Sequence, residues 1–365
     1  MHDNEVLFVL GTRPEIIKLA PVIRSVADSN RLSIRLLHTG QHYDDELSET
    51  FFDDLGVPTP DDHLGVGSGT QATQTGDAMQ GIEQVLLDRD PSFVVAVGDT
   101  NAVLSAALAA AKLDPLFAHV EAGIRSFDTS MPEEINRVVA DHVADLAFAP
   151  TETAVDHLST ESVAADIHFV GNTVVDACIE HVSIADQRST IRKDLDVNNR
   201  SYAVATIHRA RNTDDKARLQ TIVEALDEQP FPVVFPVHPR TGAALEEIEF
   251  EPTNSLQFVD PLGYLDFLDL LSGATVAITD SGGVQEEASI LEIPCLTVRP
   301  NTERPETVGA GVNRLLEPQE LSDWIEAVST DPDLQGEMTG ATYLYGDGTA
   351  GDQIVSILEE VVEPS

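Results

Sequence analysis

Short apolar runs alternate with longer amphipathic stretches along the whole chain, and this alternation constrains the fold more than any other feature. The amphipathic stretches, such as residues 14–27 and 100–112, have the pattern of helices. In the first half, the apolar runs predict strands at residues 5–10, 32–38, 92–98, 116–120, 146–149 and 167–170. Strands that alternate with helices form parallel sheets covered by helices on both faces.

The alternation restarts after a polar segment at residues 186–200, which predicts a second domain. Its predicted strands cover residues 202–206, 232–236, 256–259, 275–278 and 294–298. A typical domain has about 150 residues, so a chain of 365 residues fits two. We therefore expect an α/β protein with two Rossmann-like, doubly wound domains that face each other across a cleft, with the boundary after Gly171. Ligands of such sheets bind beyond the carboxyl ends of the strands.

The charge balance is strongly acidic, because 63 Asp and Glu residues against 21 Lys and Arg residues give a formal net charge of −42. Such a surface repels nucleic acid, so we expect no nucleic-acid partner. The acidic residues are spread along the whole chain. This distribution favours a solvated shell in a salt-rich, halophilic cytoplasm, where counter-ions screen the repulsion, over a cation-binding surface.

Apolar runs such as residues 93–97 are far shorter than the roughly 20 residues of a membrane span, so no membrane partner is expected. Residues 1–10 lack the basic start and cleavage site of a signal peptide, which predicts a cytoplasmic location. Cys178 and Cys295 lie in apolar segments without metal-ligand spacing. We expect buried structural thiols in preference to a disulfide or a nucleophile.

Two motifs follow strands of the first series. The sequence GTRPE at residues 11–15 is neither a GxGxxG fingerprint nor a P-loop, which argues against dinucleotides and ATP. It opens a helix whose N-terminus can bind an anion with help from Arg13 and Lys18, although an ordinary turn with a surface arginine explains it equally well. In GDT at residues 98–100, Asp99 is either a functional carboxylate or a helix N-cap.

Two more acidic segments belong to the same half. HVEAGIR at residues 119–125 places Glu121 at a strand end, followed by small residues that let a ligand approach. MPEEINR at residues 131–137 places Glu133 and Glu134 at a helix start, where acidic side chains also simply favour the helix dipole. Asp99, Glu121 and Glu133 at one sheet edge favour proton transfer, for which paired carboxylates are the usual groups.

The second half offers groups suited to a phosphate. His208 ends the first strand of that half, where a charged histidine could complement a phosphate, although a lone histidine is more often structural. DSGGVQEE at residues 280–287 opens a helix, and its backbone N–H groups could hold a diphosphate. A generic glycine-rich helix start is the alternative. The candidate binding residues of this region are Ser281, Gly282, Gly283 and Glu287, the last for ribose hydroxyls, with Arg304 in the stiff, charged loop at residues 299–307.

Together, these motifs resemble those of the non-hydrolysing UDP-N-acetylglucosamine 2-epimerase family. The similarity covers essentially the whole chain, and the motifs GTRPE, GDT, HVEAGIR, PEEINR, GNT, DSGGVQEE and ERPE occur in the family's order and spacing. The resemblance implies the glycosyltransferase-B fold, with a catalytic domain at residues 1–171 and a UDP-binding domain at 172–349. It also implies that a C-terminal helix within 350–365, centred on Asp352–Glu363, returns to the first domain, and that the protein is a homodimer.

The resemblance further implies interconversion of UDP-N-acetylglucosamine and UDP-N-acetylmannosamine, with no NAD, no metal and no other cofactor. Breaking the C1–O bond to UDP builds positive charge at C1, which acidifies C2–H so that a carboxylate can remove the proton. UDP and a 2-acetamidoglucal stay trapped until a proton returns on the other face and UDP adds back. The residues that match the family's site are Asp99, Glu121, Glu133 and His208 as catalytic groups, and Arg13, Lys18, Ser281, Gly282, Gly283, Glu287 and Arg304 as groups for the UDP-sugar.

Two departures from the family's pattern concern the substrate. Arg211 stands where relatives often carry glutamate, although Asn212 remains, and the segment between Glu121 and Glu133 is about two residues shorter than in many bacterial members, as in an archaeal or diacetamido-uronate subgroup. Gln41 and His42 resemble part of the site through which substrate activates bacterial members.

The alternatives are epimerisation of a UDP-2,3-diacetamido-glucuronate, with Arg211 or Arg125 on the sugar carboxylate, and a hydrolysing epimerase that releases the free sugar. From other classes, a glycosyltransferase of the same fold and an inactive nucleotide-sugar sensor remain open. Envelope polysaccharide or protein glycan assembly is a plausible pathway for the product.

Overall fold

The computed structural model describes residues 4–40, 49–339 and 344–362, which divide into two compact units. The N-terminal unit comprises Met1–Ala177 and Tyr345–Ser365, and the C-terminal unit comprises Cys178–Leu344. The division falls at 177/178, whereas the sequence placed it at 171/172, because helix α7 (Thr173–Arg188) runs through the boundary without a break. Gln41 and His42 lie outside the described residues.

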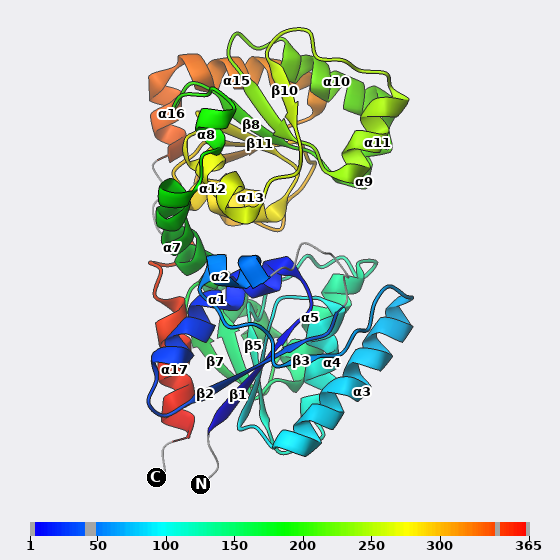
Figure 1. Cartoon of the computed structure of the whole chain (residues 1–365), viewed down its shortest axis with the longest axis vertical. Helices are drawn as coiled ribbons and strands as arrows, with labels where there is room; N and C mark the ends of the chain where they lie inside the picture. The colour runs from blue at the N-terminus through cyan, green and yellow to red at the C-terminus, as the bar shows by residue number, and fades with distance from the viewer. Residues whose placement is uncertain (1–3, 41–48, 340–343, 363–365) are drawn as a thin grey trace. The chain divides into compact units, whose positions relative to one another are not determined.

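The N-terminal unit contains a seven-stranded parallel sheet in the order β3-β2-β1-β4-β5-β6-β7 (Figure 1). Its strands are β1 (Glu5–Leu10), β2 (Ser33–His38), β3 (Asp62–His63), β4 (Phe93–Val97), β5 (Leu116–Val120), β6 (Leu146–Ala149) and β7 (Asp166–Phe169). The chain winds outward from β1 in one direction and from β4 in the other. The topological switch point, where ligands of such sheets bind, therefore lies between β1 and β4.

Helices cover both faces of this sheet. They are α1 (Arg13–Asp28), α2 (Glu49–Leu55), α3 (Gln71–Arg89), α4 (Asn101–Ala110), α5 (Pro132–Val143), α6 (Glu152–Thr160), the start of α7, and α17 (Ala350–Val361). In Figure 1, α1 and α17 lie on one face, and α3, α4 and α5 on the other. The C-terminal helix packs on α1, where Gly351 touches Pro21 and the Ser25 hydroxyl donates to Asp352 at 2.6 Å.

The C-terminal unit repeats this design with a six-stranded parallel sheet in the order β10-β9-β8-β11-β12-β13. Its strands are β8 (Ala203–Thr206), β9 (Val233–Pro236), β10 (Leu256–Val259), β11 (Val276–Thr279), β12 (Cys295–Thr297) and β13 (Asn313–Leu315). Its helices are α8 (Ile191–Asp194), α9 (Ala210–Thr213), α10 (Lys216–Asp227), α11 (Pro239–Glu247), α12 (Tyr264–Ser272), α13 (Gly282–Ile290), α14 (Pro305–Gly309), α15 (Leu321–Thr330) and α16 (Pro332–Thr339), with a 3₁₀ turn at Pro318–Glu320. The switch point here lies between β8 and β11.

The central strands β1 and β4 are almost entirely buried, as expected for strands covered on both faces. Both belong to the predicted strand series. The predicted strands omitted β3 and β13, because these short edge strands carry polar residues and lack the apolar run of a central strand. Cys178 and Cys295 are buried free thiols, as predicted, and burial raises the pKa of Cys295 to about 12.

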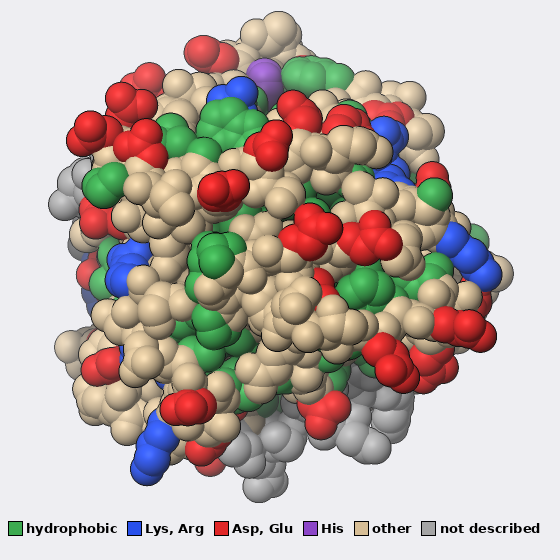
Figure 2. Space-filling view, turned by 90° about the horizontal axis from the view of Figure 1, so that it is seen from above, with side chains coloured by type: hydrophobic (Ala, Val, Ile, Leu, Met, Phe, Trp, Pro, Cys, Tyr) green, Lys and Arg blue, Asp and Glu red, His purple; other side chains and the backbone are tan. Residues whose placement is uncertain are grey.

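The surface carries many acidic and few basic side chains, and Figure 2 shows them scattered over one face without a basic patch. This agrees with the even spread of acidic residues along the sequence. Among the described residues, no helix combines the length and the apolar character that crossing a membrane requires.

Candidate active site

In both units, some of the motifs found in the sequence follow the strands that flank the switch point, whereas the segment with Glu121 follows the next strand, β5. Gly11 and Gly98 follow β1 and β4 in the N-terminal unit, and His208 and Asp280 follow β8 and β11 in the C-terminal unit. At Gly11 the backbone is so close to its neighbours that an added Cβ would lie 2.8 Å from the Cβ of Ala102. Each unit therefore presents its unusual residues where a doubly wound sheet binds ligands.

Glu15, in the first turn of α1, joins the two loops at the N-terminal switch point. Its carboxylate accepts the Gly11 N–H at 3.0 Å and the Thr12 hydroxyl at 2.8 Å, and it accepts the Thr100 hydroxyl at 2.7 Å. The side chain is buried, and burial raises its pKa to about 7 against the opposing effect of these hydrogen bonds. Sequence reasoning missed this role, because an acidic residue near a helix start is ordinary.

Two of the three cations of this helix, Arg13 and Lys18, take different partners. The Arg13 guanidinium lies over the Phe51 ring, 4.8 Å from its centroid. The Lys18 ammonium, which the sequence assigned to the UDP-sugar, pairs with the Glu121 carboxylate at 2.7 Å. Lys18 thus connects α1 to a predicted catalytic carboxylate.

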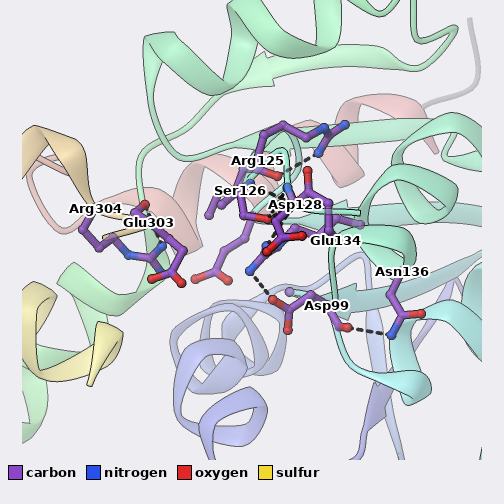
Figure 3. Close-up of polar contacts among 12 residues, drawn as sticks. Asp99, Arg125, Ser126, Asp128, Glu134, Asn136, Glu303 and Arg304 are labelled. Atoms are coloured by element: carbon purple, nitrogen blue, oxygen red, sulfur yellow. Dashed lines mark hydrogen bonds and ion pairs between the residues drawn. The ribbon is translucent and has the colours of Figure 1, made fainter. Parts of the chain in front are cut away.

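Asp99 lies at the end of β4 and is fixed from helix α5. Its carboxylate pairs with Arg137, and its backbone carbonyl accepts the Asn136 side-chain amide at 2.8 Å (Figure 3). The alternative role of N-cap belongs to the next residue, since the Thr100 hydroxyl accepts the Val103 N–H. The Asp99 carboxylate remains about one-quarter exposed, so it can be reached from solvent.

Glu121 lies at the end of β5 in a backbone conformation that is rare for a residue with a side chain, with φ of 65°. Its side chain is only 4 % exposed. Backbone strain of this kind costs about 1–3 kcal/mol and is concentrated at functional sites. The geometry therefore marks Glu121 as a carboxylate held in place by its surroundings.

A buried ionic network surrounds Glu121, and sequence reasoning missed most of it. His119 contacts Asp141 through Nδ1 at 2.6 Å and the Gly98 carbonyl through Nε2 at 2.8 Å. Asp141 also accepts the Gly123 N–H at 3.1 Å and pairs with Arg125 at 2.7 Å. Arg125 in turn forms a two-pronged pair with Glu161, at 2.8 and 2.7 Å.

The two neighbouring glutamates at the start of α5 differ in burial, since Glu134 is buried and Glu133 is exposed. Glu134 is buried and accepts the backbone N–H groups of Ser126 and Phe127 at 2.8 and 3.0 Å (Figure 3). Burial alone would raise the pKa of Glu134, but these bonds, the Ser126 hydroxyl and Arg137 outweigh it and lower the pKa. Glu133, which the sequence proposed as catalytic, is exposed.

In the C-terminal unit, Asp280 organises the loop that carries His208. Its buried carboxylate accepts the backbone N–H groups of His208 and Arg209 at 3.1 and 3.0 Å, and the Asn212 side chain at 2.9 Å. The His208 Nδ1 lies 3.2 Å from the same carboxylate. Burial lowers the pKa of His208 despite Asp280, with Arg209 and His238 acting in the same direction. This lowered pKa favours the neutral form of His208, whereas the sequence suggested a charged histidine.

The glycine-rich motif places Ser281 at the N-cap of α13, with Gly282 and Gly283 as its first residues. Among the described residues, the Ser281 side chain accepts no hydrogen bond from the first-turn N–H groups of this helix. Gln285 donates to the Ser281 carbonyl at 3.0 Å and so fixes the turn. Glu287 lies half-buried one turn into the helix. This is the arrangement in which helix N-termini bind phosphates.

Three arginines gather in the same unit. Arg299 pairs in two-pronged fashion with Glu303 at 2.7 and 2.8 Å, and Arg209 lies 3.9 Å from that carboxylate. Arg304 donates to Glu286 at 2.5 Å and to the carbonyl of its neighbour Glu303 at 3.1 Å. Burial, Arg299 and Arg304 together lower the pKa of Arg209. The cluster thus sets three arginines against the two carboxylates of Glu286 and Glu303, and this excess of one positive charge suits a bound anion.

Residues 24–359 match the family model described as UDP-N-acetylglucosamine 2-epimerase. The chain belongs to the UDP-N-acetylglucosamine 2-epimerase family. This confirms the resemblance inferred from the motifs.

Relatives of the epimerase family match over nearly their whole length. The UDP-N-acetylglucosamine 2-epimerase of Methanocaldococcus jannaschii is 44% identical over 361 residues, which cover 96% of this chain and 97% of the relative. The UDP-2,3-diacetamido-2,3-dideoxy-D-glucuronate 2-epimerase of Pseudomonas aeruginosa is 40% identical over 363 residues, covering 98% and 100%. The crystal structure of the M. jannaschii epimerase in complex with UDP-GlcNAc and UDP aligns with a TM-score of 0.86 at 42% identity, covering 98% and 99%.

The fold of this epimerase-family chain is that of two parallel-sheet α/β domains of the glycosyltransferase-B type, as predicted. Within the N-terminal unit, the structure joins Lys18 to Glu121 and holds Asp99 at the neighbouring strand end. Within the C-terminal unit, it gathers His208 and Ser281 on either side of Asp280. In the described residues, no group of three or more His, Cys, Asp or Glu side chains is arranged to hold a metal ion.

Proposed function

We propose that this protein interconverts UDP-N-acetylglucosamine and UDP-N-acetylmannosamine by inverting C2, through elimination and re-addition of UDP. One observation carries the proposal: Asp99 and Glu121 lie at the ends of the paired strands β4 and β5, each oriented by a cation from a helix of the same unit. Carboxylates placed in this way are suited to move a proton on and off a sugar ring.

In this reaction, Asp99, Glu121 and Glu133 are the candidates for proton transfer at C2. Loss of UDP from C1 leaves positive character on the ring, which nearby carboxylates stabilise, and the same charge makes C2–H acidic. A carboxylate oxygen takes the C2 proton as the C1–O bond electrons leave with UDP. Return of a proton to the opposite face, followed by attack of the UDP oxygen on C1, completes the epimerisation.

The leaving UDP is held by the C-terminal unit in this proposal. The N-terminus of α13 at Ser281, Gly282 and Gly283 offers N–H groups to the diphosphate, and Arg304 and its neighbouring arginines add fixed positive charge. A neutral His208 can donate a hydrogen bond to a phosphate oxygen, and a bound phosphate would favour its protonation. Glu287 is the candidate for ribose hydroxyls, and Arg13 for the phosphate from the N-terminal unit.

A UDP-2,3-diacetamido-glucuronate is the second candidate substrate, because a P. aeruginosa relative at 40% identity carries that activity in its name. This sugar needs a cation for its carboxylate. Arg125 is unsuited, because its side chain is 1 % exposed and already binds Asp141 and Glu161. Arg211 is exposed and lies 3.8 Å from the Glu317 carboxylate, which already offers its charge a partner. These contacts favour UDP-N-acetylglucosamine.

Incubation with UDP-N-acetylglucosamine in deuterated, high-salt buffer tests the proposal. We expect deuterium at C2 of both epimers by NMR, without any added acceptor, whereas a glycosyltransferase would need one. Epimer formed without solvent deuterium would overturn the mechanism, and no reaction with this sugar but turnover of the diacetamido-uronate would overturn the substrate. Glu121→Gln serves as the inactive control.

The acidic composition predicts that the enzyme is halophilic. With a formal charge of −42, self-repulsion is strong in dilute buffer and is screened within about 3 Å at 1 M salt. We expect the melting temperature to rise as potassium chloride is increased toward molar concentration, by about 2–4 °C for each 1 kcal/mol gained in a unit of this size. Sucrose, which screens no charge, is the control, and an equal response to both would contradict the prediction. A homodimeric state and a cytoplasmic location remain predictions from the sequence, testable by light scattering and cell fractionation.

A further inference from the structure

The ring of His119 is completely buried between two hydrogen-bond acceptors. Nδ1 lies 2.6 Å from a carboxylate oxygen of Asp141, and Nε2 lies 2.8 Å from the backbone carbonyl oxygen of Gly98. A carbonyl oxygen cannot donate, so Nε2 must carry a proton. The second question is therefore whether Nδ1 carries a proton as well.

The surroundings of Asp141 show that Nδ1 is protonated too. The other oxygen of this carboxylate accepts the Gly123 N–H at 3.1 Å and pairs with Arg125 at 2.7 Å, as expected of an ionised group. An ionised carboxylate is acceptor-only, so the 2.6 Å contact requires a proton on Nδ1. With both ring nitrogens protonated, the two cations His119 and Arg125 balance the two anions Asp141 and Glu161.

We propose that His119 is a permanently charged imidazolium that positions the carboxylates of Asp99 and Glu121 for proton transfer. This inference rests on the proposed epimerase function, in which His119 touches no substrate and is a positioning residue. One nitrogen holds the carbonyl of the residue before Asp99. The other nitrogen contacts Asp141, which also contacts Gly123 and Arg125. Asp141 is therefore bonded to the chain on both sides of Glu121.

These contacts of Asp141 explain how Glu121 keeps its uncommon backbone conformation. Gly123, two residues later, has φ of 82°, and an added Cβ would lie 2.3 Å from the Ala154 carbonyl oxygen, so only glycine fits at this point of the loop. The charged groups facing His119 are Asp141 from α5 and Glu121 from its own loop. Burial alone lowers the pKa of His119, but Asp141, Gly98 and Glu121 outweigh it and raise the pKa.

NMR of the enzyme labelled with ¹⁵N-histidine tests the charge directly and needs no substrate. The His119 signal is identified as the one missing from His119→Gln. We expect both ring nitrogens to stay protonated well above the ordinary histidine pKa of about 6.5. Loss of one ring proton near that pH would overturn the inference.

Asp141→Asn tests the positioning role with little change of shape. It should convert His119 to the neutral form. The remaining proton should stay on Nε2, because the Gly98 carbonyl oxygen can only accept a hydrogen bond. We expect kcat to fall about 100-fold, as for a misplaced proton-transfer group, with KM and UDP affinity little changed. Asp145→Asn is the matched control, since Asp145 also accepts a backbone N–H of β5, from Phe117 at 2.8 Å, away from this network.

The outcomes separate this inference from the proposed function. Full kcat in a folded Asp141→Asn enzyme, or a rise in KM alone, would overturn the positioning role. If Asp141→Asn unfolds, the charge on wild-type His119 still decides the inference by NMR. A wild-type enzyme that leaves UDP-N-acetylglucosamine unchanged would overturn the proposed substrate, and a doubly protonated ring in that enzyme would support the inference about His119 separately.

Discussion

The buried carboxylates beside the strand ends of the two units are held in different ways. In the N-terminal unit, Glu121 and Asp141 each contact a cationic side chain, so the acids are held while keeping their charge. In the C-terminal unit, the Asp280 carboxylate is occupied mainly by backbone N–H groups and shapes a loop. Several arginines lie near Asp280. Burial and the neighbouring Arg299 and Arg304 lower the pKa of Arg209. The first arrangement suits proton transfer, and the second suits an anionic leaving group.

Removing a carboxylate of the N-terminal unit should produce the largest effect. Asp99→Asn or Glu121→Gln takes away a proton acceptor while keeping the side-chain shape, so we expect kcat to fall on the order of 10³-fold. UDP affinity, measured by calorimetry, should be unchanged, because neither Asp99 nor Glu121 is among the groups proposed to hold UDP. Glu83→Gln on the exposed surface of α3 is the control. Unchanged kcat would remove the residue from the mechanism.

The second-largest effect is expected for Glu15→Gln, which should show how the buried Glu15 carboxylate makes the free energy of unfolding depend on pH. The folded pKa is about 7 against 4.5 in the unfolded chain, so the folded state binds the extra proton between these values. Stability contributed by this proton is fully present below pH 4.5 and is lost as the pH rises through 7, by about 3 kcal/mol in all. The variant should lack this loss, as measured by urea unfolding across that range. Parallel wild-type and variant profiles would refute a raised pKa for Glu15.

The sequence could predict where the candidate residues lie, because both informative signals are local. Apolar runs locate the strands, and unusual residues directly after a run must lie at the carboxyl edge of a parallel sheet. Asp99, Glu121 and Ser281 were found in this way. Edge strands such as β3 were missed, because a two-residue polar strand carries no apolar run.

The supporting residues could not be predicted, because their partners are distant in the sequence. His119 and Asp141 are 22 residues apart, and Lys18 and Glu121 are 103 apart, so only folding brings them together. Arg125 illustrates the consequence. Its charge made it a candidate for a sugar carboxylate, but burial against Asp141 and Glu161 makes it part of the scaffold.

The adjacent residues Glu133 and Glu134 allow a sharper division within the N-terminal unit. Glu133→Gln should lower kcat by about 100-fold without changing the melting temperature, because this side chain is exposed. Glu134→Gln should destabilise the unit by about 1.5–3 kcal/mol, because it weakens charged hydrogen bonds to the Ser126 and Phe127 N–H groups. Kinetics and thermal unfolding of both variants measure the contrast. The reverse pattern would show that Glu134 is the reactive carboxylate.

Arg304→Gln should give the smallest of these effects, and it tests the C-terminal side of the comparison. Arg304 is held by Glu286 and the Glu303 carbonyl, so its charge is fixed in place, but it shares the cluster with Arg209 and Arg299. We expect UDP to bind about tenfold more weakly, a change of about 1.4 kcal/mol, because the remaining arginines still attract the phosphates. Arg314→Gln removes the same charge from an exposed arginine stacked on Trp324 and should leave UDP affinity unchanged. An equal loss in both variants would mean that UDP responds to the overall field of the unit, and the arginine cluster would then have no local role in binding the anion.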